Sequence, residues 1–198
     1  MQAVESQTLI LYHSELRGEW PWSAARALAA ALPYAKRIEV GAQPQRAPAT
    51  LAGIALALRA LSRLAGRPVA AAELRFPQHG KPHLGRAGER CDFSISHSGP
   101  WVACAAVAEG LVGFDLELGT DARHVEWAAR EAALKACGAG IAAAPAVRLR
   151  GDGAIFGRVR LHARTLALFP GAAACVMTSR ALREVEARAL TLGELFAA

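Results

Sequence analysis

The stretch "GFDLE", residues 113–117 of a chain of 198 residues, raises a physical question about the fold. Its apolar positions Phe114 and Leu116, continued by Leu118, alternate with two acids, Asp115 and Glu117. Side chains leave a strand on alternating faces, so the pattern predicts both carboxylates on one face and the apolar set in a core. Like charges on one face repel each other. The pair therefore indicates either an exposed strand face or a site where a cation lies between the carboxylates.

The composition narrows the class of protein. The formal net charge of +6 favours an acidic partner, although a solvated basic surface explains it equally well. The arginines are scattered, and no run of basic residues supports a nucleic-acid groove. No apolar run reaches the ~20 residues that span a bilayer, and the first residues lack a basic leader. The four cysteines form no CxxC pair. We therefore expect a cytoplasmic monomer that binds neither nucleic acid nor membrane.

Periodicity and chain breakers place the elements along the sequence. Helices are predicted over residues 21–32, 50–66, 122–137 and 192–196, with Thr50 as an N-cap and Gly66 and Gly138 as stops. Glycine and prolines predict a loop over residues 35–48. Strands are predicted over residues 8–13, 73–76, 92–97, 101–108, 111–118, 146–150, 154–163, 165–169, 173–179 and 183–190. Helices interspersed with short strands indicate an α+β fold.

The helix predicted over residues 122–137 follows the acidic strand after a short connection. Trp127, Glu131 and Lys135 are successive i, i+4 positions and share one face of it. Taken alone, Glu131 and Lys135 would be an ordinary helix ion pair. After this strand, however, Glu131 can face Asp115 and Glu117. Three converging carboxylates predict a site for a hard divalent cation.

Two further stretches carry groups that bind phosphate oxygens. The turn "HGKPHL", residues 79–84, holds Lys81 between a glycine and a proline. The strand end "DFSISHSG", residues 92–99, places Ser96 and His97 among other hydroxyl groups. A lysine, a histidine and hydroxyl groups near glycines suit phosphate binding. Each stretch alone is also explained by ordinary turn and backbone hydrogen bonding.

The order of these motifs is more specific than any one of them. GKP, F-x-I-S-H-S, G-x-D-x-E and W-x-x-(K/R)-E-A-x-x-K follow one another from Gly80 to Lys135. In this the chain resembles the 4′-phosphopantetheinyl transferase superfamily, most closely its two-halved, surfactin-synthetase-activating type. The resemblance implies two pseudo-symmetric α+β halves, residues 1–108 and 109–198, each a helix packed on a small antiparallel sheet. The active site would lie in the cleft between them, with the adenosine end of coenzyme A on the first half.

The resemblance also implies an activity. Such enzymes transfer 4′-phosphopantetheine from coenzyme A to a serine of an apo acyl or peptidyl carrier protein and release adenosine 3′,5′-bisphosphate. By matching position, Asp115, Glu117 and Glu131 would hold Mg²⁺ against the pyrophosphate, and metal and catalytic residues would lie in the second half. Glu131 would also be the catalytic base, and Lys135 would stabilise charge on the phosphates. Coenzyme A contacts are implied for Lys81, Pro82, Ser96, His97 and Thr50, with Lys36, Arg37 and Arg46 as candidates for the 3′-phosphate.

The chain departs from the family pattern in the link before the helix. Arg130 replaces a usual lysine, which keeps the charge, but the link over residues 118–126 is much shorter than in typical members. The lost residues would normally flank the carrier-protein groove. A second interpretation is therefore a coenzyme A-binding paralogue that lost transferase activity. A third, a basic nucleic-acid or partner-binding protein, is disfavoured because clustered carboxylates repel phosphates unless a metal is present.

Overall fold

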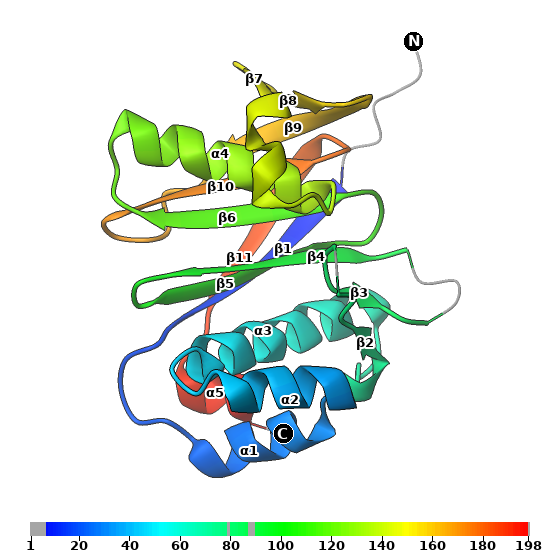
Figure 1. The fold of residues 1–198 in the computed structure, drawn as a ribbon, viewed down its shortest axis with the longest axis vertical. Helices are drawn as coiled ribbons and strands as arrows, with labels where there is room; N and C mark the ends of the chain where they lie inside the picture. Colours follow the sequence, from blue (N-terminus) through cyan, green and yellow to red (C-terminus); the bar gives the residue numbers. More distant parts are fainter. Residues whose placement is uncertain (1–6, 79, 87–89, 198) are drawn as a thin grey trace.

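The computed structural model describes residues 7–78, 80–86 and 90–197. The first residue of the predicted turn over residues 79–84, and the first six residues of the predicted N-terminal half, lie outside this range. Within it the elements form successive layers, with helices below a first sheet, a second sheet above it, and one helix on top (Figure 1).

Two sheets build the centre of the molecule. The first has the strand order β11 (Leu182–Ala189), β1 (Gln7–Glu15), β5 (Trp101–Val107) and β4 (Asp92–Ser98). The second has the order β6 (Val112–Leu118), β10 (Ala172–Thr178), β9 (Val159–Thr165), β8 (Gly153–Phe156) and β7 (Arg148–Arg150). A small hairpin pairs β2 (Leu74–Arg75) with β3 (His83–Leu84).

Helices cover the outer faces of both sheets. The first sheet is covered by α1 (Trp22–Ala31), α2 (Tyr34–Ala42), α3 (Ala47–Ala65) and α5 (Leu192–Phe196), and the second by α4 (Ala122–Ala136) (Figure 1). Short 3₁₀ turns occupy Ala71–Glu73 and Ile141–Ala146. The α+β class predicted from the sequence is confirmed.

Alternation along single strands explains the layering. In β1, Leu9 and Leu11 pack between the two sheets, whereas Ile10 and Tyr12 pack against the helices below. All four are buried, so this strand is apolar on both faces and must lie inside the protein. A separate core lies between α4 and the upper face of the second sheet.

The sheets differ from the prediction in one respect. The first sheet is mixed rather than antiparallel, because β1 pairs in parallel with β11. This strand and α5 come from the end of the chain, so elements beyond residue 109 complete the first layer. The return is consistent with strand chemistry, because the apolar β1 needs a neighbour on each edge.

Several local predictions were wrong. The single strand predicted over residues 154–163 is two strands, β8 and β9, joined by a turn at residues 157–158. Residues 35–48 are largely helical, because their glycine and prolines fall near the ends of α2 and the start of α3 instead of breaking a helix centre. The helix α3 starts at Ala47, and Thr50 donates its amide to the Arg46 carbonyl, so Thr50 lies in the first turn and is not the N-cap. Residues 166–169 are not a strand, because β9 ends at Thr165.

The long helix α3 is the main support of the first sheet. Gly53 faces β4 so closely that an added Cβ would lie 2.5 Å from the Ile95 Cγ2 atom. Gly66 ends the helix in the left-handed region, as predicted. Among the described helices α3 alone is long and apolar enough to cross a membrane, but half of its apolar window is buried in this core.

The two sheets meet edge to edge along β4 and β6. Alternate side chains of β4 accept hydrogen bonds from main-chain amides of β6: Asp92 from Val112, Ser94 from Phe114, and Ser98 from Leu118, at 2.8, 3.0 and 3.1 Å. Side chains therefore satisfy edge amides that a further strand would otherwise pair. This seam positions the candidate site.

Candidate metal centre and adjoining cavity

The site begins where α4 packs on β6. A Cβ on Gly113 would lie 1.8 Å from the Ala132 carbonyl oxygen, so only glycine lets the helix backbone rest on the strand. This close approach brings Glu131 over Asp115 and Glu117. The three carboxylates each offer an oxygen within 4.8 Å of the others. The convergence predicted from the sequence is therefore present.

The strand is less regular than the alternation predicted. Phe114 and Leu116 are buried as expected, but Leu118 is 44% exposed at the strand end, and its placement in the core was wrong. Asp115 is only 1% exposed, so it does not lie on an exposed strand face.

Asp115 has two very different oxygens. Its Oδ1 accepts a hydrogen bond from the Ser96 hydroxyl at 2.8 Å and another from the Lys135 ammonium group. Its Oδ2 is buried and has no hydrogen-bond partner among the described residues. An unsatisfied buried carboxylate oxygen is destabilising, so it indicates a missing partner.

The pKa values of the two neighbouring glutamates are both raised. Burial, and then the charge of Asp115, raise the pKa of Glu117 above its usual range. The same two causes raise the pKa of Glu131, and Lys135 only partly opposes them. A cation between the carboxylates would remove this repulsion.

These observations test whether the residues fit a metal ion. Three carboxylates in reach of one another, one with an orphaned buried oxygen, make an all-oxygen ligand set. Oxygen ligands are what Mg²⁺ and Ca²⁺ prefer, with water completing the coordination. Lys135 neutralises only the Oδ1 side of Asp115. The residues therefore fit a hard divalent cation.

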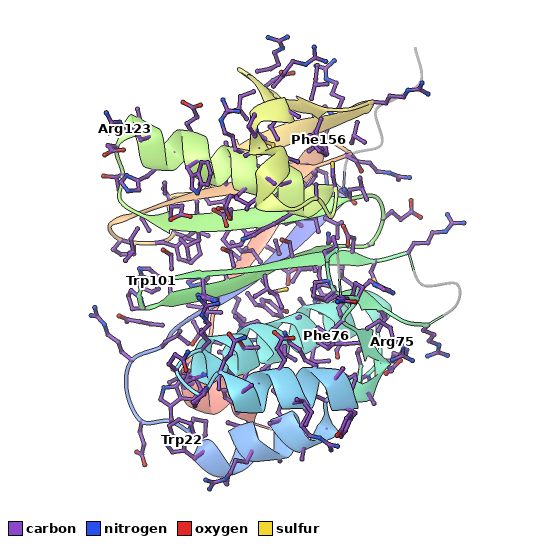
Figure 2. The ribbon with its side chains drawn as sticks, viewed as in Figure 1. Trp22, Arg75, Phe76, Trp101, Arg123 and Phe156 are labelled. Atoms are coloured by element: carbon purple, nitrogen blue, oxygen red, sulfur yellow. The ribbon has the colours of Figure 1, made fainter. Side chains whose placement is uncertain are left out.

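Two cavities adjoin at the carboxylates. A smaller one of about 180 Å³ lies over the three acids, and a larger one of about 350 Å³ extends from it toward α3. Ile95, His97 and Lys135 line both. The larger cavity also gathers further predicted residues, namely Lys36, Thr50, Lys81 and Pro82. Its walls are otherwise mostly apolar and include Phe76, which lies beside the β2–β3 hairpin (Figure 2).

Lys81 reaches this cavity but is already bonded. Its ammonium group lies 2.6 Å from Asp92 Oδ2 and 2.7 Å from the Val112 carbonyl oxygen. Burial lowers its pKa, and the Asp92 carboxylate opposes that shift. The side chain thus joins the starts of β4 and β6 with two of its three ammonium donors.

The other predicted basic residues are placed unequally. Lys36 lines the cavity, with its ammonium 5.2 Å from the centroid of the Phe76 ring and 2.7 Å from Glu39 Oε1. Arg46 is close enough to His97 to help lower its pKa, after the larger effects of burial and Lys135. Arg37 lies over the Tyr34 ring and does not line either cavity.

Asp92 is the residue of this site that the sequence analysis missed. Its carboxylate accepts both the Lys81 ammonium and the Val112 amide. The signal was present in "DFSISHS", where Asp92, Ser94 and Ser96 alternate with apolar residues and share one face of the strand.

Ser96 departs from its neighbours on this face. Its hydroxyl donates a hydrogen bond to the Asp115 carboxylate and accepts one from Lys135 at 2.9 Å, whereas Ser94 and Ser98 bond main-chain amides.

No protein-family model matches the chain, and the comparison with curated proteins finds no match either. The interpretation of the site therefore depends on this geometry and on the order of the motifs.

Proposed function

We propose that this protein is a Mg²⁺-dependent 4′-phosphopantetheinyl transferase. The observation that carries the proposal is the group of three carboxylates, one of them with an orphaned buried oxygen, beside a cavity with basic groups and apolar walls. The order of the motifs from Gly80 to Lys135 supports the same activity. The substrates would be coenzyme A and an apo acyl or peptidyl carrier protein.

The cavity suits the two parts of coenzyme A. Its apolar wall, which includes Ile54, Phe76 and Phe93, offers surface for a purine ring. Lys36 and His97 offer donors to phosphate oxygens on the way to the carboxylates. Asp115, Glu117 and Glu131 would hold Mg²⁺, which would neutralise charge on the pyrophosphate.

The protein's own groups account for the proton and the leaving group. The carrier serine oxygen forms a bond to the β-phosphorus of coenzyme A, and the bond from that phosphorus to the bridging oxygen breaks. Glu131 accepts the serine proton, directly or through water, because its carboxylate lies beside the reacting phosphates. Lys135, within 3.9 Å of Glu131, stabilises the charge on the departing adenosine 3′,5′-bisphosphate.

The finer description of the fold is part of the proposal. In each half one long helix rests on a sheet, α3 on the first and α4 on the second, and glycine allows close packing in both. The sheets meet at the β4–β6 seam, next to the cavities. Two pseudo-symmetric halves with a site between them would explain this repetition.

A second candidate, a coenzyme A-binding paralogue without transferase activity, is favoured by one observation. Only residues 119–121 separate β6 from α4. This leaves Leu118 and Trp127, each at least 40% exposed, at the edge of the carboxylate cluster. If the missing segment is needed to dock a carrier, coenzyme binding would persist without transfer.

The decisive experiment combines a transfer assay with a binding assay. The protein is incubated with coenzyme A, Mg²⁺ and a panel of apo carrier proteins, and intact mass shows whether any carrier gains phosphopantetheine. Asp115→Asn is the inactive variant, and Glu126→Gln, on an exposed face of α4, is its matched control. Modification of any carrier by the wild type and the control alone supports the transferase. Coenzyme binding without modification of any carrier supports the paralogue.

A further inference from the structure

A cavity of about 530 Å³, larger than either cavity at the carboxylates, lies away from them. Its lining includes residues of α1, α3 and α5, three helices that lie below the first sheet in Figure 1. Its volume falls within the ~300–1,000 Å³ typical of small-molecule sites. The helix α3 lines both cavities with different residues, Ala55 and Leu58 here and Thr50 and Ile54 toward the coenzyme cavity. The two cavities share no lining residue.

The walls of this cavity are largely hydrocarbon. Aliphatic and aromatic side chains from two segments of the chain, residues 24–69 and 190–196, contribute, namely Ala24, Leu28, Ala55, Leu58, Val69, Leu190, Leu195 and Phe196. Such walls favour an apolar ligand body, because its burial removes hydrocarbon surface from water.

Two arginines give the cavity a charged end. The three hydrogen bonds of Arg59 go to main-chain carbonyls of residues 194, 195 and 197, and all three start from Nε and Nη2. These acceptors are neutral, and the Nη1 donors of the five-donor guanidinium remain. Arg188 also lines the cavity, and its guanidinium lies 3.9 Å from the Glu194 carboxylate, beyond hydrogen-bond distance.

The charged groups at this end of the cavity indicate the charge of the ligand. Glu194 commits its other oxygen to the Thr191 amide at 2.8 Å and to the Thr191 hydroxyl, which caps α5. Among the described residues, two guanidinium groups thus face one carboxylate at this end, which leaves one positive charge. We propose that this cavity binds an organic monocarboxylate with a hydrocarbon body, its carboxylate at Arg59 and Arg188 and its body between α1 and α3. The site is independent of the transferase activity.

The test compares ligands that differ only in the head group. Dodecanoate and dodecanol, below their aggregation concentrations, are titrated into the full chain by calorimetry. We expect one dodecanoate per chain and at least tenfold weaker binding of dodecanol, because only the carboxylate pairs with the arginines.

Two variants test whether dodecanoate binds in this cavity. Arg188→Gln should weaken dodecanoate binding about tenfold, or ~1.4 kcal/mol, and leave dodecanol unchanged. The Arg188 side chain is 63% exposed, so the variant should fold normally. Arg183→Gln on the same strand, whose side chain does not line the cavity, should bind dodecanoate like the wild type. Equal binding of the two ligands, a stoichiometry above one, equal affinity in Arg188→Gln, or no binding at all would overturn the proposal.

Discussion

Replacing Glu131 by glutamine should stabilise the metal-free protein and weaken its response to Mg²⁺. The carboxylate oxygens of the cluster lie within 4.8 Å of one another. At that separation and an effective dielectric constant of about 20, two unit charges repel by roughly 3–4 kcal/mol. Lys135 and solvent offset much of this, so we expect a net gain of about 1 kcal/mol in the free energy of unfolding. For a chain of this size such a gain raises the Tm by about 2–4 °C.

The same substitution removes a charged ligand of the proposed metal site. In the wild type, Mg²⁺ at a hundredfold excess over its Kd should stabilise the folded state by about 2.7 kcal/mol. With Glu131→Gln we expect the affinity to fall at least tenfold, or ~1.4 kcal/mol, and about half of the thermal shift or more to disappear. Thermal unfolding with and without Mg²⁺, followed by circular dichroism, measures both effects in one series.

Glu126→Gln is the matched control on the same helix. It breaks an exposed pair with Arg130, so it should change the Tm little and keep the full Mg²⁺ shift. The reasoning would be refuted if Glu131→Gln lowered the metal-free Tm, or if it kept the Mg²⁺ shift of the wild type.

Four further predictions concern packing, the seam, pH and salt. Gly113→Ala should destabilise the fold by about 3 kcal/mol in denaturant unfolding, because its Cβ meets the backbone of α4, whereas Gly41→Ala has open space and should be neutral or stabilising. Lys81→Met should lower the free energy of unfolding by roughly 3 kcal/mol, because it leaves the Asp92 carboxylate without its partner, and adding Asp92→Asn should recover part of the loss. Unchanged stability of Lys81→Met would contradict this prediction. The pKa values of Glu117 and Glu131 are raised in the folded protein, so the metal-free protein should lose stability as the pH rises from the usual glutamate range through those values. The Mg²⁺ affinity should rise over the same pH range, because the carboxylates become charged. Unfolding and Mg²⁺ titration at several pH values would show both effects. At saturating coenzyme A, kcat/KM for an acidic carrier protein should fall steeply with salt if the +6 net charge steers docking, and a flat profile would exclude it.

Strong periodicity made most of the elements predictable. The strands around residues 9 and 115 and the helices α3 and α4 each bury a continuous apolar set, so local pattern and final packing agree. The parallel return of β11 to β1 was not predictable in this way. Its sequence alternates weakly, and its place depends on which sheet edge is free after the rest has folded.

The candidate site, too, was predictable only in part. The convergence of Glu131 with the two strand acids could be predicted, because i, i+2 spacing on the strand and a short link to α4 leave little freedom. The burial of Asp115 could not, because it depends on Ser96 and β4 lying alongside β6. Nor could the pairing of Lys81 with Asp92, which joins residues from different elements.

The β4–β6 seam explains why the carboxylates lie where they do. Two sheet edges that meet without a main-chain ladder need side chains to satisfy their amides, and Asp92, Ser94 and Ser98 supply them. Ser96 occupies the same face of β4 but bonds the Asp115 carboxylate, so at this one point the seam binds an acid from the neighbouring sheet. The hydroxyl holds Oδ1 toward β4, and Oδ2 has no hydrogen-bond partner among the described residues. The feature that joins the two sheets therefore also orients a carboxylate of the proposed metal site, so Ser96→Ala should weaken the Mg²⁺-induced thermal shift, whereas Ser94→Ala should leave that shift unchanged and lower the metal-free Tm.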